Sequence, residues 1–226
     1  MTSTYASALI SSLMLAWVAP NGLVGTASME KGVDACEKKG ANSHECARAI
    51  EELALQRPGS AARRNDEILE IRTTKGYTAF HDAISESNNS VAYSYLGYLE
   101  QIKSHVVHVQ YYEGNSFLIL DYNVASKAYA AGFPIVSPDN QRFLSIYQDA
   151  YGEFGGTHIE MWSVNASGST REATFQPSWM PVSAVWLDAN KFEIAKLCLS
   201  EEDDLEYLPC GKAHGEHSDR NRSLSQ

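Results

Sequence analysis

FPIVSPDNQRFLSIYQDAYGEFGGTHIEMWSV, residues 133–164, is the stretch in which turn chemistry and strand periodicity agree best. Its first feature is a turn over residues 137–140, where Pro138 fixes the backbone angle φ. Asp139 and Asn140 can hydrogen-bond to the nearby backbone, and they tolerate unusual backbone angles. A tight turn that leads directly into a strand is therefore expected here.

Two extended segments follow this turn, at residues 142–147 and 158–164, and a glycine-rich connection separates them. The pattern resembles one blade of a β-propeller, in which a Ser-Pro-Asp turn precedes one strand and an aliphatic-Trp pair closes the next. Residues 177–194 repeat part of the pattern. A closed propeller needs at least four blades of about 40 residues each, and the β region expected in this chain is too short for that.

Period-two alternation of apolar and polar residues continues through most of the chain after the helix breaker Pro58-Gly59. Further strands are expected at 69–73, 77–80, 91–99, 104–112, 116–122, 170–175, 183–187 and 191–197. Turn residues separate these segments and no helical pattern intervenes, which predicts antiparallel sheets. The expected fold class is α+β and mainly β, with blade-like sheets packed as a sandwich or as an incomplete propeller.

The N-terminal part of the chain predicts one amphipathic helix. Asn42 is suited to cap it, and Glu45 completes a capping box. Apolar residues recur at helical spacing from Cys46 to Ala54. We therefore expect a helical segment over residues 28–65 and an antiparallel β domain over residues 66–199.

The first 27 residues have the features of a secretory signal peptide. No charged side chain occurs in them, an apolar core precedes small residues, and cleavage is expected near Ala27. No later segment is apolar enough to span a bilayer. These features are typical of a secreted or periplasmic protein of bacterial type, without a stable membrane span after cleavage.

The cysteines and the C-terminal residues complete the expected organisation. Cys36 with Cys46, and Cys198 with Cys210, are close enough in sequence for two short-loop disulfides, although four cysteines permit three connectivities. Disulfides fit an oxidising compartment. Residues 200–226 are acidic and have little to bury, so this tail is expected to be largely disordered.

Composition and motifs argue against several kinds of chemistry. The formal charge of −10 and the absence of a basic stripe disfavour a nucleic-acid partner. No local signature of a nucleophile, a phosphate loop or a metalloprotease occurs, so catalysis is not favoured and neither a cofactor nor a metal is expected. Cys210, His214 and His217 have spacing that could chelate a metal, but they lie in the expected tail.

Aromatic residues are the remaining resource for function. Tyr93, Tyr95 and Trp179 are the predicted binding residues, because Tyr and Trp dominate contact energies at binding surfaces. We expect a monomeric or weakly associating protein whose sheet surface binds a protein or a glycan. Two alternatives stay open: an inhibitor or immunity-type factor against an exported hydrolase, and a hydrolase with a dispersed active site.

Overall fold

The computed structural model describes residues 43–85, 89–148, 156–199, 207–217 and 222–225. It divides into two compact units. The N-terminal unit contains the described residues up to 131 together with the hairpin tip 164–170. The C-terminal unit contains residues 132–163 and the described residues from 171 onward. The expected signal segment, residues 1–27, lies outside the described residues.

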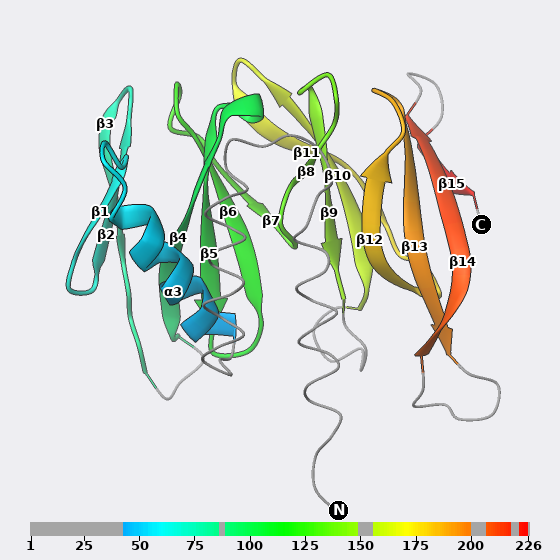
Figure 1. Ribbon diagram of the computed structural model, residues 1–226, viewed down its shortest axis with the longest axis horizontal. Coiled ribbons are helices and arrows are strands. Elements are labelled where there is room, and N and C mark those ends of the chain that lie inside the picture. Colours follow the sequence, from blue (N-terminus) through cyan, green and yellow to red (C-terminus); the bar gives the residue numbers. More distant parts are fainter. Residues whose placement is uncertain (1–42, 86–88, 149–155, 200–206, 218–221, 226) are drawn as a thin grey trace, which may run out of the picture. The chain divides into compact units, whose positions relative to one another are not determined.

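The N-terminal unit consists of helix α3 (Ser43–Leu55) and two antiparallel sheets (Figure 1). The three-stranded sheet has the order β1 (Ala62–Asn65), β2 (Ile68–Thr73), β3 (Gly76–His81). The four-stranded sheet has the order β4 (Val91–Leu99), β5 (Ser104–Tyr111), β6 (Asn115–Asp121), β7 (Lys127–Ala130). A short 3-10 helix, η1 (Glu100–Ile102), links β4 to β5.

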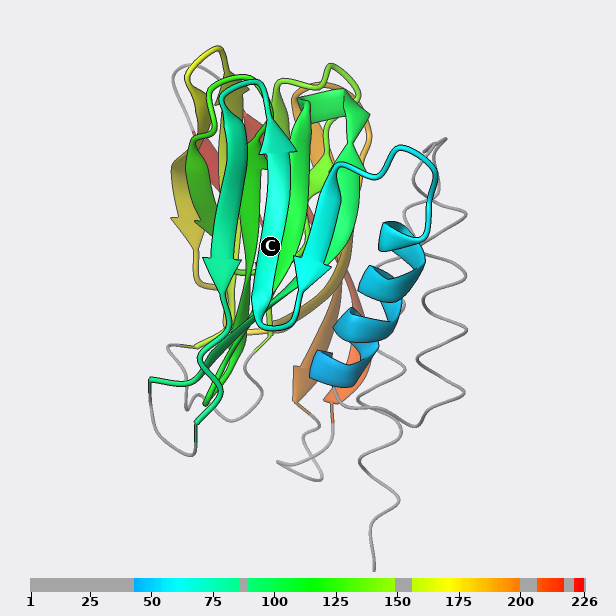
Figure 2. The same cartoon turned by 90° about the vertical axis from the view of Figure 1, so that its left-hand side faces the viewer.

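These two sheets pack face to face around one core (Figure 2). The core takes residues from both sheets and from the end of α3: Ala54, Ala62, Leu69, Ile71, Phe80, Tyr95, Val107, Val109, Leu118 and Leu120. Alternate strand residues supply this core because successive side chains of a strand point to opposite faces. The period-two burial expected from the sequence is therefore confirmed in this unit.

The C-terminal unit repeats the arrangement with two four-stranded antiparallel sheets. One has the order β11 (Gly168–Phe175), β10 (His158–Asn165), β9 (Arg142–Tyr147), β8 (Ile135–Val136). The other has the order β12 (Met180–Trp186), β13 (Lys191–Leu199), β14 (Tyr207–His217), β15 (Arg222–Ser225). Their shared core is formed by Leu144, Ile159, Met161, Trp179, Ala184, Trp186, Phe192, Ile194 and Ala213.

The turn over residues 137–140 has the expected geometry. The Asn140 amide donates to the Ser137 carbonyl at 3.0 Å, and Asn140 adopts φ of 61°. The Ser137 hydroxyl donates to Asp139 Oδ1 at 2.6 Å and also accepts the Arg142 amide at 3.0 Å. The turn therefore begins β9 as the sequence predicted.

The expected fold class, mainly β with antiparallel sheets and an N-terminal helix, is confirmed. Strand β4 has the predicted bounds, and the other predicted strands are present with small shifts at their ends. The predicted helix is present from Ser43 to Leu55, and its expected cap Asn42 lies outside the described residues. Gly59, with φ of 77°, lies in the connection that follows the helix.

Three short strands were missed, and one expectation about the C-terminus is wrong. Strands β1, β7 and β8 have four, four and two residues, too few for a periodic pattern. The tail expected to be disordered instead contributes β14 and β15 to a sheet. The inward positions of β14 hold Ala213, Gly215 and His217. A search for large apolar residues therefore does not detect this strand.

Covalent bonds support both ends of the described chain. The predicted Cys198–Cys210 disulfide joins β13 to β14. Cys46 in α3 is also disulfide-bonded, and its expected partner, Cys36, lies outside the described residues. Within the described part of the chain, no helix combines the length and the apolar content that a membrane span needs.

Strand β14 yields a test of the corrected C-terminus. Gly215 lies opposite Phe192, and a Cβ atom at Gly215 would overlap the buried Phe192 ring. We expect Gly215→Ala to lower the free energy of unfolding by about 1–3 kcal/mol, because the ring must shift within a packed core. Urea unfolding measures this change.

Glu216→Ala is the matched control, because Glu216 is the exposed next residue of the same strand. We expect this control to stay within about 0.5 kcal/mol of the parent protein. Equal stability of the two variants would contradict the packing of β14 on β13.

Candidate functional site

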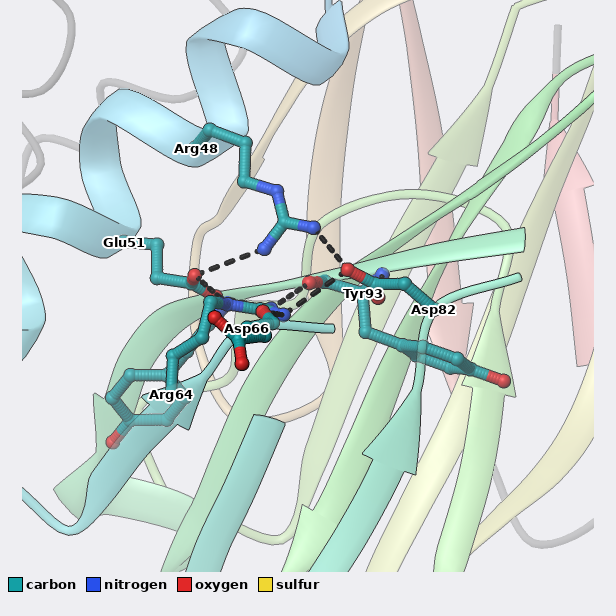
Figure 3. Close-up of polar contacts among 7 residues, drawn as sticks. Arg48, Glu51, Arg64, Asp66, Asp82 and Tyr93 are labelled. Atoms are coloured by element: carbon teal, nitrogen blue, oxygen red, sulfur yellow. Dashed lines mark hydrogen bonds and ion pairs between the residues drawn. The ribbon is translucent and has the colours of Figure 1, made fainter. Parts of the chain in front are cut away.

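Four charged side chains from three parts of the N-terminal unit meet beside β4 (Figure 3). Arg48 and Glu51 come from α3, Arg64 comes from β1, and Asp82 follows β3. The Glu51 and Asp82 side chains are only 3% and 2% exposed. We call these four residues the ion-pair cluster.

Each carboxylate of the ion-pair cluster contacts both guanidinium groups. Arg48 Nη1 donates to Glu51 Oε1 at 3.0 Å, and Arg64 Nη2 donates to Glu51 Oε2 at 3.1 Å. Arg64 Nη1 donates to Asp82 Oδ2 at 3.1 Å, and Arg48 Nη2 contacts the same oxygen. Two positive charges thus balance two negative ones, which is the condition under which buried carboxylates are tolerated.

Both carboxylates also accept backbone N–H groups of β4, the first strand of its sheet. The Tyr93 amide donates to Asp82 Oδ1 at 2.8 Å, and the Tyr95 amide donates to Glu51 Oε2 at 2.6 Å. Arg64 Nη2 donates to the Tyr93 carbonyl. Side chains therefore occupy the hydrogen-bonding positions that a neighbouring strand would fill, and they cap the β4 edge.

The ion-pair cluster also fixes the position of Tyr93. Its backbone is bonded on both sides, while its ring points away from the charged groups (Figure 3). The ring packs against Phe80 of β3 with a centroid separation of 5.2 Å. Tyr93 is half-buried, so one part of the ring is anchored and another faces solvent.

Two more tyrosines lie on the face of the sheet that carries Tyr93. Tyr93 pairs with Val109, and Tyr111 follows Val109 by two residues on the same face. Tyr129 pairs with Leu118, which shares the core with Val109. We call Tyr93, Tyr111 and Tyr129 the tyrosine patch.

The tyrosine patch is open to solvent and electrically neutral. Tyr111 is 38% exposed and Tyr129 is 46% exposed. Burial raises the pKa of Tyr93, as do the nearby hydroxyls of Tyr129 and Tyr111. Burial also raises the pKa of Tyr129, with a further contribution from Tyr111. The Tyr111 hydroxyl lies 3.2 Å from Ser116 Oγ.

The buried histidines of β5 lie apart from this patch. His105 Nε2 donates to the Arg72 carbonyl at 3.0 Å, which leaves Nδ1 to accept from the Tyr95 hydroxyl at 3.1 Å. Burial lowers the pKa of His105 to about 4. Burial, followed by the charge of His44, lowers the pKa of His108 to about 4. Both rings are therefore neutral at pH 7.

A buried carboxylate of the C-terminal unit also has polar partners from its own sheet. The Trp162 indole N–H donates to Glu160 at 3.1 Å, and Arg171 Nη1 donates to Glu160 at 2.7 Å. Trp162 also stacks on Phe143, with ring planes 9° apart. Glu160 thus positions Trp162, which stacks on Phe143 within the segment expected to resemble a blade. These contacts stabilise the sheet.

Of the three predicted binding residues, the structure leaves only Tyr93 partly open to solvent. Tyr95 and Trp179 are 4% and 6% exposed and belong to the two cores, so their assignment as surface contacts is corrected. Tyr95 points inward because the pairing of β4 with β5 places it opposite the core residue Val107. Sequence reasoning missed Tyr129, because four-residue β7 gave no periodic signal, and it assigned Tyr111 to no site.

The structure separates the residues whose spacing suggested a possible metal site. Cys210 is bonded to Cys198, and His217 Nε2 lies 3.3 Å from Glu172 Oε2. No group of three or more His, Cys, Asp or Glu side chains suited to a metal ion occurs within the described ranges.

Comparison with known proteins gave no match, either to a protein-family model or to a curated protein sequence. The functional argument therefore depends on the fold and on the tyrosine patch.

The ion-pair cluster predicts a large difference between two adjacent glutamates of α3. Glu51→Ala should lower the free energy of unfolding by about 3–5 kcal/mol, because two partly buried arginines lose one of their two carboxylate partners and the Tyr95 amide loses its acceptor. Glu52→Ala is the matched control, since Glu52 is exposed on the same helix turn. Chemical denaturation compares the two, and similar losses would contradict the edge-capping role.

The buried histidines predict a loss of stability in acid. Unfolded histidine binds its proton near pH 6.5, whereas folded His105 and His108 do so only near pH 4. The unfolded chain therefore binds more protons between these values, and stability falls as the pH drops from 6.5 toward 4. The loss is on the order of 3 kcal/mol for each histidine.

Urea unfolding at pH 7 and pH 4.5 measures this dependence. His108→Leu should remove about half of it, because it removes one of two similar contributions. His81→Gln, at an exposed position, should leave it unchanged. An unchanged pH dependence in His108→Leu would rule out the proposed cause.

Proposed function

We propose that this protein is an exported β protein that binds another macromolecule through the tyrosine patch. The observation that carries the proposal is the position of Tyr93, Tyr111 and Tyr129. They come from three strands of one sheet; the Tyr93 ring packs against Phe80 of the other sheet, while Tyr111 and Tyr129 on the same face are exposed.

The chemistry of these side chains suits a contact surface. A tyrosine ring offers apolar area together with one hydroxyl, and it loses little conformational freedom on binding. Tyrosine hydroxyls are protonated at pH 7 because their ordinary pKa is about 10, and burial raises the pKa of Tyr93 and Tyr129 further, so both can donate hydrogen bonds. The patch therefore suits a partner with both apolar surface and hydrogen-bond acceptors, as proteins and glycans have.

The scaffold beneath the patch supports preorganised binding. Val109 and Leu118, the cross-strand neighbours of Tyr93 and Tyr129, are fully buried, and the ion-pair cluster holds the Tyr93 backbone at both its amide and its carbonyl. Contact residues that are already ordered lose less entropy on binding than flexible ones. Binding is therefore expected to involve little rearrangement of β4 to β7.

Export is part of the proposal and is supported by covalent chemistry. The Cys198–Cys210 bond links two strands, and disulfides persist mainly in oxidising compartments. The apolar N-terminal segment of the sequence favours the same location.

A binding screen tests the proposal. Labelled full-length protein would be applied to a glycan array and to the secreted and envelope fractions of the producing cell, with bound partners identified and their affinities measured. The double variant Tyr111→Ala/Tyr129→Ala should bind the identified partner at least about tenfold more weakly, because each lost aromatic contact costs on the order of 1 kcal/mol or more.

Tyr77→Ala is the matched control, because Tyr77 is 51% exposed but lies on the other sheet. It should retain parental affinity. Full binding by the double variant, or no specific ligand in either screen, would overturn the proposal.

A further inference from the structure

Strand β3 ends the three-stranded sheet with an unpaired edge. The strand order is β1-β2-β3, and in the described part of the chain β3 has β2 as its only strand neighbour. The outer edge of such a strand presents N–H and C=O groups that can pair with another chain. The other three sheets have four strands each.

The register of the β2–β3 hairpin identifies the groups on this edge. Thr73 pairs with Gly76 across a two-residue loop, so their backbone groups bond to each other. Because bonded and non-bonded pairs alternate, the backbone groups of Tyr77, Ala79 and His81 point away from β2. The bond from the Asp82 amide to the Glu67 carbonyl, 2.8 Å long, fits the same alternation.

The composition of β3 differs from that of the other edge strands. Proteins commonly protect edges with charged residues, proline or covering groups. The ion-pair cluster caps β4, and β8 has only two residues. Charged residues or proline occur in β1, β7, β11, β12 and β15: Arg63, Arg64, Lys127, Arg171, Glu172, Pro181 and Arg222. Strand β3, Gly76–His81, contains no Asp, Glu, Lys, Arg or Pro.

We propose that β3 pairs with β3 of a second copy of this chain, antiparallel and centred on Ala79. Residues that lie directly opposite in a sheet point to the same face, so self-pairing requires a register centred on a residue. Ala79 is the middle of the three residues whose backbone groups face outward. In this register Tyr77 lies opposite His81 of the second copy, and Thr78 lies opposite Phe80.

The charge of the chain limits where two copies can meet, and β3 is a strand edge without an acidic residue. Two copies that each carry a formal charge of −10 repel one another, so contact is least unfavourable where the meeting strands carry no acidic residue. The pairing forms about six backbone hydrogen bonds, two for each opposed pair. A contact of this size belongs to the weak, concentration-dependent class of interfaces.

Light scattering coupled to size-exclusion chromatography tests the pairing with the full chain. The measured mass should approach twice the monomer mass as the concentration rises toward about 1 mM, where a weak interface becomes populated. Ala79→Pro should remain monomeric, because it removes an outward amide without removing a bond to β2. Ala79→Val, which keeps the amide, should associate like the parent protein.

Cross-linking tests the register independently of any folding defect in Ala79→Pro. Two copies of Ala79→Cys should be joined by a short bis-maleimide linker, because this residue faces itself across the two-fold axis. His81→Cys should cross-link far less, because it faces Tyr77.

The expected pair of results is association of the parent protein and preferential cross-linking at position 79. A parent protein that stays monomeric throughout the concentration range would overturn the proposal. Equal cross-linking at both positions, or association that Ala79→Pro leaves intact in a folded protein, would overturn it as well.

Discussion

The N-terminal unit depends on how the edge of β4 satisfies its hydrogen bonds. Among the described residues, the outer edge of β4 has strand-type pairing only at the bridge between Ala83 and Val91, so the Tyr93 and Tyr95 amides need other acceptors. Carboxylates from Glu51 and Asp82 accept these amides, and Arg48 and Arg64 neutralise the carboxylates. One polar cluster thereby fastens the helix and both sheets to each other, since removing any member leaves a buried group without its partner.

This constraint also shapes the surfaces of the unit. Because the β4 edge is capped, the Tyr93 backbone is fixed, and its ring forms one part of the tyrosine patch. In the part of the chain that the structure describes, the edge of β3 has no such cap, and the strand itself contains no charged residue. In our proposals, one sheet face offers aromatic rings to a different molecule, and one strand edge offers backbone groups to another copy of the chain.

The fold was predictable where local patterns were long enough to repeat. Alternation identified β4, β5 and β13, and the turn at residues 137–140 began β9 at the expected residue. Strands of two to four residues gave no periodic signal. Strand β14 was missed because its inward side chains are small, which allows the Phe192 ring to lie against Gly215.

The sequence by itself determined the class of elements, since side-chain alternation and turn residues act over a few neighbouring positions. It also determined that aromatic residues would be abundant on the strands, and it indicated the Cys198–Cys210 pair. Only the tertiary structure decided which tyrosines reach solvent: Tyr95 lies beneath the facing sheet while Tyr111 and Tyr129 extend past it. Only the tertiary structure brings Arg64 into contact with both Glu51 and Asp82. These residues are far apart along the chain, so no local sequence pattern links them.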